Sequence, residues 1–142
     1  MKFLYKIILP VTLFVSVSLV LASNSNETAH SLASNSITNQ QSNRADLDKL
    51  KKEIDREIGR PSAKRLTQCK VIAFGAKPCG GPTTYLVYSS LQTKENKLKR
   101  LVGQYNSLQD KINKETDAIS DCLFLEEPKP TIQNGMCKIK RN

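Results

Sequence analysis

The stretch KPCGGPTTYLVYSS, Lys77 to Ser90, decides how the rest of this sequence is interpreted. A cysteine, two glycines and a proline are followed at once by residues that favour β-strands. The segment CKVIAF, Cys69 to Phe74, precedes it and has the same strand-forming character. The two segments predict a β-hairpin whose long connection, residues 75–82, is stiffened by its prolines.

The glycines of this connection do not fit a nucleotide-binding loop. Such a loop lies between a strand and a helix and has a lysine just after its glycines, whereas Lys77 precedes them here. Cys79 is not predicted to be a nucleophile, because the one histidine, His30, lies far upstream. We interpret the connection as a disulfide-anchored candidate binding loop made by Lys77, Pro78, Gly80, Gly81 and Pro82.

The four cysteines, Cys69, Cys79, Cys122 and Cys137, predict two disulfides if the protein is exported. Their wide spacing does not predict a zinc site, and no metal or cofactor is expected. Our preferred pairing joins Cys69 to Cys137, between neighbouring strands, and Cys79 to Cys122. The sequential pairing of the first two and the last two cysteines is the close alternative.

Export itself is predicted by residues 1–22, which combine two lysines, an apolar stretch and a small-residue cleavage pattern typical of a signal peptide. We therefore expect a secreted or periplasmic protein. Residues 23–45 are rich in serine and asparagine, and we expect a disordered linker there because such residues bury little apolar surface. Residues 46–142 are expected to form a single domain.

Two amphipathic helices are predicted in this domain. The first begins at Asp46, carries apolar residues at helical spacing and ends at Gly59. Its charged residues, Glu57 among them, are expected to face solvent. The second and longer helix has apolar residues at heptad spacing: Leu91, Leu98, Leu101, Tyr105, Leu108, Ile112 and Ile119. We expect this stripe to pack inside a monomer, and a coiled-coil dimer is the alternative.

The C-terminal segment adds a second hairpin. Asn134-Gly135 between two short β-forming runs is typical of a tight two-residue turn. The strand that carries Cys137 is expected to lie beside the strand that begins at Cys69. The predicted fold class is therefore α+β: a small antiparallel sheet packed against one short and one long amphipathic helix, with two disulfides.

Residues 69–137 resemble a group of small exported, mostly bacterial proteins. The resemblance lies in G-x-K-P-C-G-G-P-x-x-Y-L-x-Y-S, Gly75 to Ser89, followed by Ser120-Asp121-Cys122 and a last Gly-x-Cys. The chain departs from the group at Thr83, where an aromatic residue often follows the proline. The resemblance implies export and disulfides, and it implies no reaction and no functional residue.

Three functional hypotheses follow from these observations. We favour a non-enzymatic exported binding protein with an inhibitor-like mode of action, because a rigid loop with an exposed Lys77 suits insertion into the cleft of an unidentified protein partner. The alternative is a basic envelope protein that binds an anionic surface, consistent with the formal net charge of +9. A weak hydrolase comes third, and no nucleotide is expected. The anionic-surface hypothesis depends on a candidate basic stripe on the second helix: Lys97, Arg100, Lys111 and Lys114.

Overall fold

The computed structural model describes residues 25–140, and their side chains from residue 38 onward. The order of elements is α1 (Ser25–Ile58), a single 3-10 turn (Leu66–Gln68), β1 (Cys69–Phe74), β2 (Thr84–Ser89), α2 (Glu95–Glu115), β3 (Pro130–Gln133) and β4 (Met136–Ile139). The predicted α+β class is confirmed. The predicted signal peptide lies outside the described residues.

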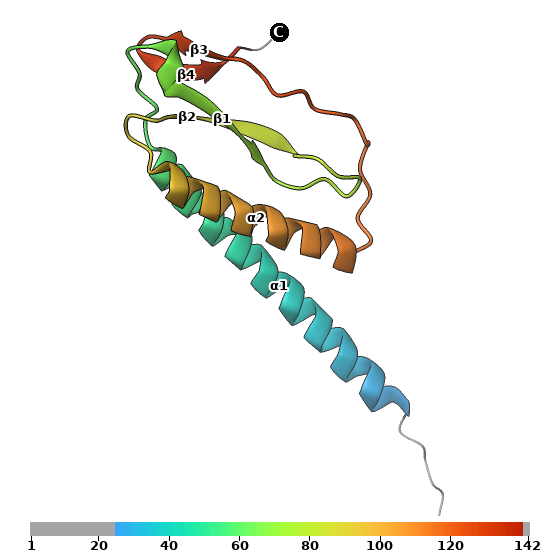
Figure 1. Cartoon of the computed structure of the whole chain (residues 1–142). Coiled ribbons are helices and arrows are strands. Elements are labelled where there is room, and N and C mark those ends of the chain that lie inside the picture. The colour runs from blue at the N-terminus through green and yellow to red at the C-terminus, as the bar shows by residue number, and fades with distance from the viewer. Residues whose placement is uncertain (1–24, 141–142) are drawn as a thin grey trace, which may run out of the picture.

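Helix α1 differs from its prediction because it includes most of the segment expected to be a linker. It spans 34 residues and begins at Ser25, far upstream of Asp46. Its N-terminal half extends past the rest of the molecule, as Figure 1 shows. Once the packed half has formed, each further residue adds a backbone hydrogen bond without the cost of nucleation, so weak helix formers can continue the helix. The end of α1 is as predicted, since Gly59 has a φ of 53° and its N–H donates to Asp55 O at 2.9 Å.

The two helices pack antiparallel and cover one face of the β1–β2 hairpin (Figure 1). Hydrogen bonds at both ends fix their orientation, from Asn43 to Glu115 and from the Lys94 N–H to Glu57. The core between the three elements consists of Ile54 of α1, Phe74 of β1, Tyr88 of β2, and Leu98, Leu101 and Val102 of α2.

The heptad stripe is confirmed in its central part and wrong at its two ends. Leu98 is fully buried, and Tyr105 stacks on Phe74 with ring centroids 4.2 Å apart. Leu91 and Ile119 lie outside α2 and expose 56% and 95% of their surface. The apolar face of α2 is therefore shorter than the sequence pattern, and α1 and the hairpin cover its centre.

The strands form two separate antiparallel hairpins rather than one sheet. In the first, Cys69 pairs with Ser89 and Phe74 with Thr84. In the second, Gln133 pairs with Met136 around the predicted Asn134-Gly135 turn, whose two residues both have positive φ. Cys137 lies against the face of β1–β2 opposite the helices, in a small core with Ala63 and Cys69. The two hairpins are thus joined through side chains and a disulfide, and not through backbone pairing.

Candidate functional site

The candidate binding loop, residues 75–83, forms a compact turn at the far end of the β1–β2 hairpin. Lys77 N–H donates to Gly81 O and Gly80 N–H donates to Lys77 O, each at 2.9 Å. Gly80 and Gly81 have φ values of 93° and 79°, a region that side chains disfavour. No heavy atom lies within 4 Å of the Cβ position of either glycine. Backbone conformation, and not crowding, therefore explains why glycine occupies both positions.

Helix α2 holds this loop through a row of amide side chains that face it. Asn106 Oδ1 accepts from Gly75 N–H at 2.7 Å, and Gln109 Oε1 accepts from Ala76 N–H at 2.9 Å. Asn113 Nδ2 donates to Ala76 O at 2.8 Å. Sequence reasoning missed this row, although its helical spacing is a signal for one polar face. The loop is consequently attached to α2 as well as to the first hairpin.

Gly75 enters the loop at a position that has no room for a side chain. Its φ is 81°, and a Cβ there would overlap the Thr83 hydroxyl. That hydroxyl donates to Phe74 O at 3.0 Å, and the Thr83 N–H donates to the same oxygen at 3.1 Å. The base of the loop is therefore closed by Thr83 directly against the last residue of β1.

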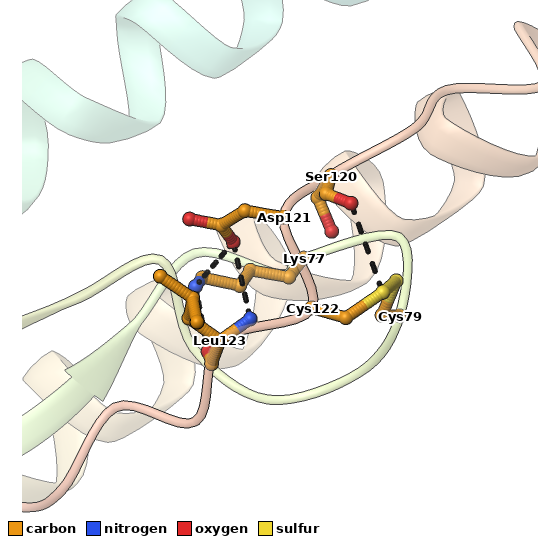
Figure 2. Close-up of a disulfide and its surroundings, with 6 residues drawn as sticks. All are labelled: Lys77, Cys79, Ser120, Asp121, Cys122 and Leu123. Atoms are coloured by element: carbon orange, nitrogen blue, oxygen red, sulfur yellow. Dashed lines mark hydrogen bonds and ion pairs between the residues drawn. A yellow bond between two sulfur atoms is a disulfide. The ribbon is translucent and has the colours of Figure 1, made fainter.

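Lys77 is not the exposed residue that the sequence predicted. Only 16% of its side chain is exposed, and its ammonium reaches a segment far along the chain. Its Nζ donates to Asp121 Oδ1 at 3.1 Å and to the backbone oxygen of Leu123 at 2.9 Å, as Figure 2 shows. A partly covered ammonium needs hydrogen-bond acceptors, and these two oxygens supply them.

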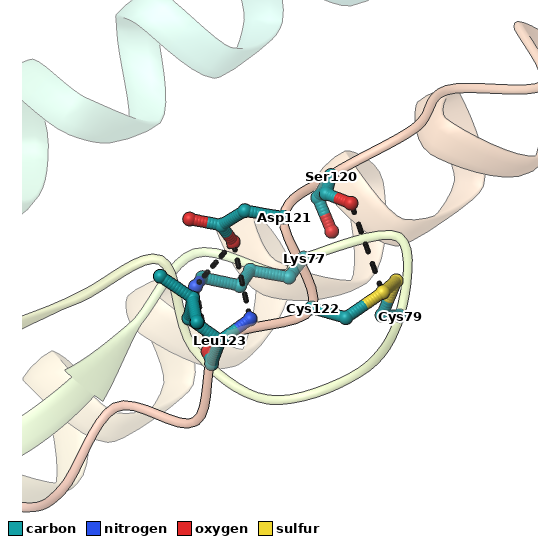
Figure 3. A network of polar contacts seen from close by, with 6 residues as sticks. All are labelled: Lys77, Cys79, Ser120, Asp121, Cys122 and Leu123. Atoms are coloured by element: carbon teal, nitrogen blue, oxygen red, sulfur yellow. Dashed lines mark hydrogen bonds and ion pairs between the residues drawn. A yellow bond between two sulfur atoms is a disulfide. The ribbon is translucent and has the colours of Figure 1, made fainter.

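The segment that Lys77 contacts connects α2 to β3 and is called the strap here, residues 118–129. The strap has no regular secondary structure and runs from the end of α2 along the loop to the second hairpin (Figure 1). Asp121 Oδ1 also accepts the Leu123 N–H at 3.2 Å, so one carboxylate oxygen joins the loop to the strap (Figure 3). The hydrogen bond from Lys77 holds the pKa of Asp121 below its ordinary value.

The two predicted disulfides of the preferred pairing are confirmed. Cys69–Cys137 links the hairpins and is buried, with 4% and 0% exposure. Cys79–Cys122 links the loop to the strap, and both of its residues are exposed. Cys122 Sγ also lies 3.7 Å from Ser120 O, a contact rather than a hydrogen bond because a disulfide sulfur carries no proton. The sequential pairing does not form.

Beyond its attachment to the loop, the strap exposes three consecutive apolar residues. The exposed fractions are 68% for Leu123, 88% for Phe124 and 38% for Leu125. The Leu125 carbonyl accepts a hydrogen bond from the Tyr85 hydroxyl at 3.2 Å, which gives the strap a second attachment to the first hairpin. An apolar tripeptide is thereby held outward between two attachment points, and sequence reasoning did not assign it any role.

The candidate basic stripe lies on exposed positions of α2, but most of its charges have partners. Lys111 and Lys114 form ion pairs with Glu115 and Asp110 on the same helix. Lys97 Nζ lies 2.7 Å from Glu57 Oε2 of α1, whose side chain is only 9% exposed. The prediction that Glu57 faces solvent is therefore wrong. The Lys97 hydrogen bond holds the pKa of Glu57 below its ordinary value.

Within the part of the chain that the structure describes, no group of three or more histidine, cysteine, aspartate or glutamate residues could hold a metal ion. None of the helices in the described range is long and apolar enough to span a bilayer. Comparison with protein-family models, curated proteins and solved structures found no match for this chain. The resemblance of residues 69–137 to small exported proteins therefore stays a prediction.

Proposed function

We propose that this protein is a non-enzymatic, exported binding protein that presents Leu123, Phe124 and Leu125 of the strap to the cleft of another protein, in the manner of an inhibitor. The observation that carries the proposal is the 88% exposure of Phe124 within a segment fixed on both sides. Large aromatic residues are among the strongest anchors of protein interfaces. An aromatic side chain held in water by a fixed backbone is well suited to enter an apolar pocket.

The attachments of the strap support a binding role because they reduce the entropy lost on association. Cys79–Cys122 and the Lys77 contacts fix the strap just before Leu123, and the Tyr85 hydroxyl fixes it at Leu125. Ordering a flexible segment on binding weakens affinity, and a segment that is already ordered avoids this cost. In this proposal the glycine-rich loop positions the strap, and the strap makes the contact.

Export is part of the proposal and rests on two features. The N-terminal 22 residues match a signal peptide in sequence, and disulfides persist in oxidising compartments. A secreted or periplasmic protein with a preorganised apolar strap would meet proteases and other secreted enzymes. The polyanion alternative has less support, because three of its four basic residues already form ion pairs.

The test is titration of the oxidised protein against extracellular endopeptidases that differ in specificity. We expect inhibition of chymotrypsin, whose primary pocket accepts large apolar side chains, and weaker inhibition of trypsin, whose pocket accepts basic ones. Phe124→Asp should abolish the inhibition of chymotrypsin, and Phe124→Lys should shift the preference toward trypsin.

The matched control is Leu91→Asp, which places the same charge at an apolar residue of 56% exposure away from the strap. This variant should inhibit like the parent protein. If no endopeptidase of the panel is inhibited and no protein is captured by the parent more strongly than by Phe124→Asp, the proposal is wrong. Disulfide mapping of each variant verifies that the strap is still attached.

A further inference from the structure

A second candidate site, distinct from the exposed apolar residues of the strap, lies along the outer edge of β2. It is an open groove of about 860 Å³ between the end of α1 and the second hairpin, which we call the β2 slot. Residues of α1, β2 and the second hairpin line it: Asp55 and Ile58 of α1, Tyr85, Leu86 and Val87 of β2, Gln133 of β3, and residues 138–140 at the end of β4.

The β2 side of the slot presents backbone groups that β1 does not use. Ser90 N–H donates to Gln68 O, which makes Lys70–Tyr88 and Ile72–Leu86 the hydrogen-bonded pairs of the hairpin. In such a ladder the alternate residues of β2, Tyr85 and Val87, direct their N–H and C=O groups away from β1. No backbone hydrogen bond outside the strand pairs engages these groups among the described residues.

The opposite side of the slot is partly occupied already, because Ser62 forms an antiparallel bridge with Met136 along the edge of β4. Gln133 and Met136 close a two-residue turn as a hydrogen-bonded pair, so Cys137 and Ile139 direct their backbone groups toward the outer edge of β4. Cys137 N–H donates to Pro61 O at 2.8 Å, and this bond shows which way that edge faces. The groups of Ile139 have no such partner among the described residues.

The charge of the slot is positive. Asp55 is already in an ion pair with Lys51, at 2.6 Å. Lys138 and Lys140 are exposed and form no ion pair with a carboxylate of the described residues. A segment with free backbone groups and carboxylate side chains would therefore complement both the edges and the charge of the slot.

We propose that the β2 slot binds an extended acidic segment of a partner protein, which adds a strand to the edge of β2. Backbone hydrogen bonds to Tyr85 and Val87 give the register, and Lys138 and Lys140 select acidic side chains. Ile58 and Ile139 provide apolar surface for alternate side chains of the same segment. The strap takes no part in this binding, although Tyr85 contacts both sites.

The probe for the test is a short fluorescent peptide of alternating valine and glutamate, blocked at both ends. Fluorescence anisotropy with the oxidised protein should show saturable binding that weakens with added salt. The same peptide with lysine in place of glutamate should bind far more weakly. N-methylation of alternate residues removes the donors along one edge of the peptide, and one of the two methylated registers should lose binding.

Matched variants locate the site. Lys138→Glu with Lys140→Glu should weaken peptide binding about tenfold or more, because two attractions become repulsions. Lys52→Glu with Lys64→Glu makes the same change of charge at exposed positions outside the slot and should change affinity by less than about twofold. Phe124→Asp should leave peptide binding unchanged, which separates this proposal from the proposed function.

Three outcomes would overturn strand addition at the slot. The first is equal binding by the unmodified and both methylated peptides. The second is equal loss of binding in the two double variants. The third is a dimer in sedimentation that the peptide dissociates, because the slot would then hold a second copy of this chain.

Discussion

The ammonium nitrogen of Lys77 lies 2.9 Å from the backbone oxygen of Leu123, although 46 residues separate them in the sequence. This contact places the strap directly after Cys122, where the disulfide has already brought the two segments together. A lysine that appears from the sequence to face a partner is instead used to position the residues that face outward. The loop and the strap therefore behave as one unit, and substitutions in the loop should alter the position of Phe124.

We expect the attachment of the strap to depend on pH through Asp121. The folded-state pKa of Asp121 is lowered by the Lys77 hydrogen bond, so this contact contributes stability above the ordinary aspartate pKa of about 3.9 and loses it as the pH falls through the lowered value. The amide proton of Leu123, which donates to the same carboxylate, should lose protection at acidic pH, when its exchange rate is compared with the intrinsic rate of an unprotected amide at the same pH. NMR-detected hydrogen exchange between neutral and strongly acidic pH measures this.

The control for this prediction is Lys77→Met, which removes the charge and keeps most of the apolar stem. In this variant the Asp121 pKa, followed by NMR titration, should return toward the ordinary aspartate value. An unchanged titration of Asp121 would show that Lys77 does not cause the shift. Glu57 also has a lowered pKa and affects overall stability in the same pH range, so the measurement has to be specific to Asp121.

Mild reduction should open Cys79–Cys122 before Cys69–Cys137. Both residues of the first disulfide are exposed, whereas Cys69 and Cys137 are buried and out of reach of a thiol in solution. Brief treatment with dithiothreitol, alkylation and peptide mass spectrometry should find label on Cys79 and Cys122 alone. The singly reduced protein should keep its circular dichroism spectrum and lose inhibition. Label appearing equally on all four cysteines would contradict this order.

Gly75→Ala should destabilise the protein by about 2–5 kcal/mol. The new methyl group would overlap the Thr83 hydroxyl, and alanine disfavours the positive φ of this residue. Gly103→Ala is the matched control, because Gly103 lies in α2 with open space around it. There alanine should stabilise by about 0.5–1 kcal/mol through helix propensity. Urea unfolding of both variants measures the two effects, and equal stabilities would show that the base of the loop tolerates a side chain.

The heptad stripe offers a pair of leucines with opposite expected behaviour. Leu98→Ala should lower the free energy of unfolding by about 2–5 kcal/mol, because Leu98 of α2 is fully buried against α1 and the first hairpin. Leu91→Ala should change it by less than about 0.5 kcal/mol, since Leu91 is more than half exposed. Thermal unfolding followed by circular dichroism distinguishes them. Similar losses in the two variants would indicate that Leu91 is buried in solution, as in a coiled-coil dimer.

The features that sequence predicted well are those set by local chemistry. Asn134-Gly135 dictates a tight turn, Gly59 ends α1, and the β-branched run at Cys69–Phe74 forms a strand with the bounds predicted for it. The disulfide pairing was predicted from the segments expected to lie near each other, although Cys69 and Cys137 meet between two separate hairpins and not between paired strands of one sheet.

What sequence could not predict are contacts between segments distant in the chain. Glu57 looked like one more charged residue of α1, yet its carboxylate accepts the Lys94 N–H at the start of α2 and pairs with Lys97. Leu123 and Phe124 carry no motif, and their exposure follows from the path that the strap takes. The heptad pattern gave no sign of where α2 begins and ends, since its apolar spacing continues through residues that are not helical.

Disulfide formation has an order in time as well as a place in the fold. Cys79 is the cysteine nearest to Cys69 in the sequence, and the bridge between them would be the wrong one. Once β1 pairs with β2, Cys69 lies at the start of a six-residue strand, roughly 17 Å long, and Cys79 lies in the loop beyond its far end, whereas a disulfide needs Cα atoms within about 7 Å. A hairpin that forms early would thus keep these two thiols apart until Cys122 and Cys137 reach them. The same strand that forms the core would then act as a spacer against misoxidation.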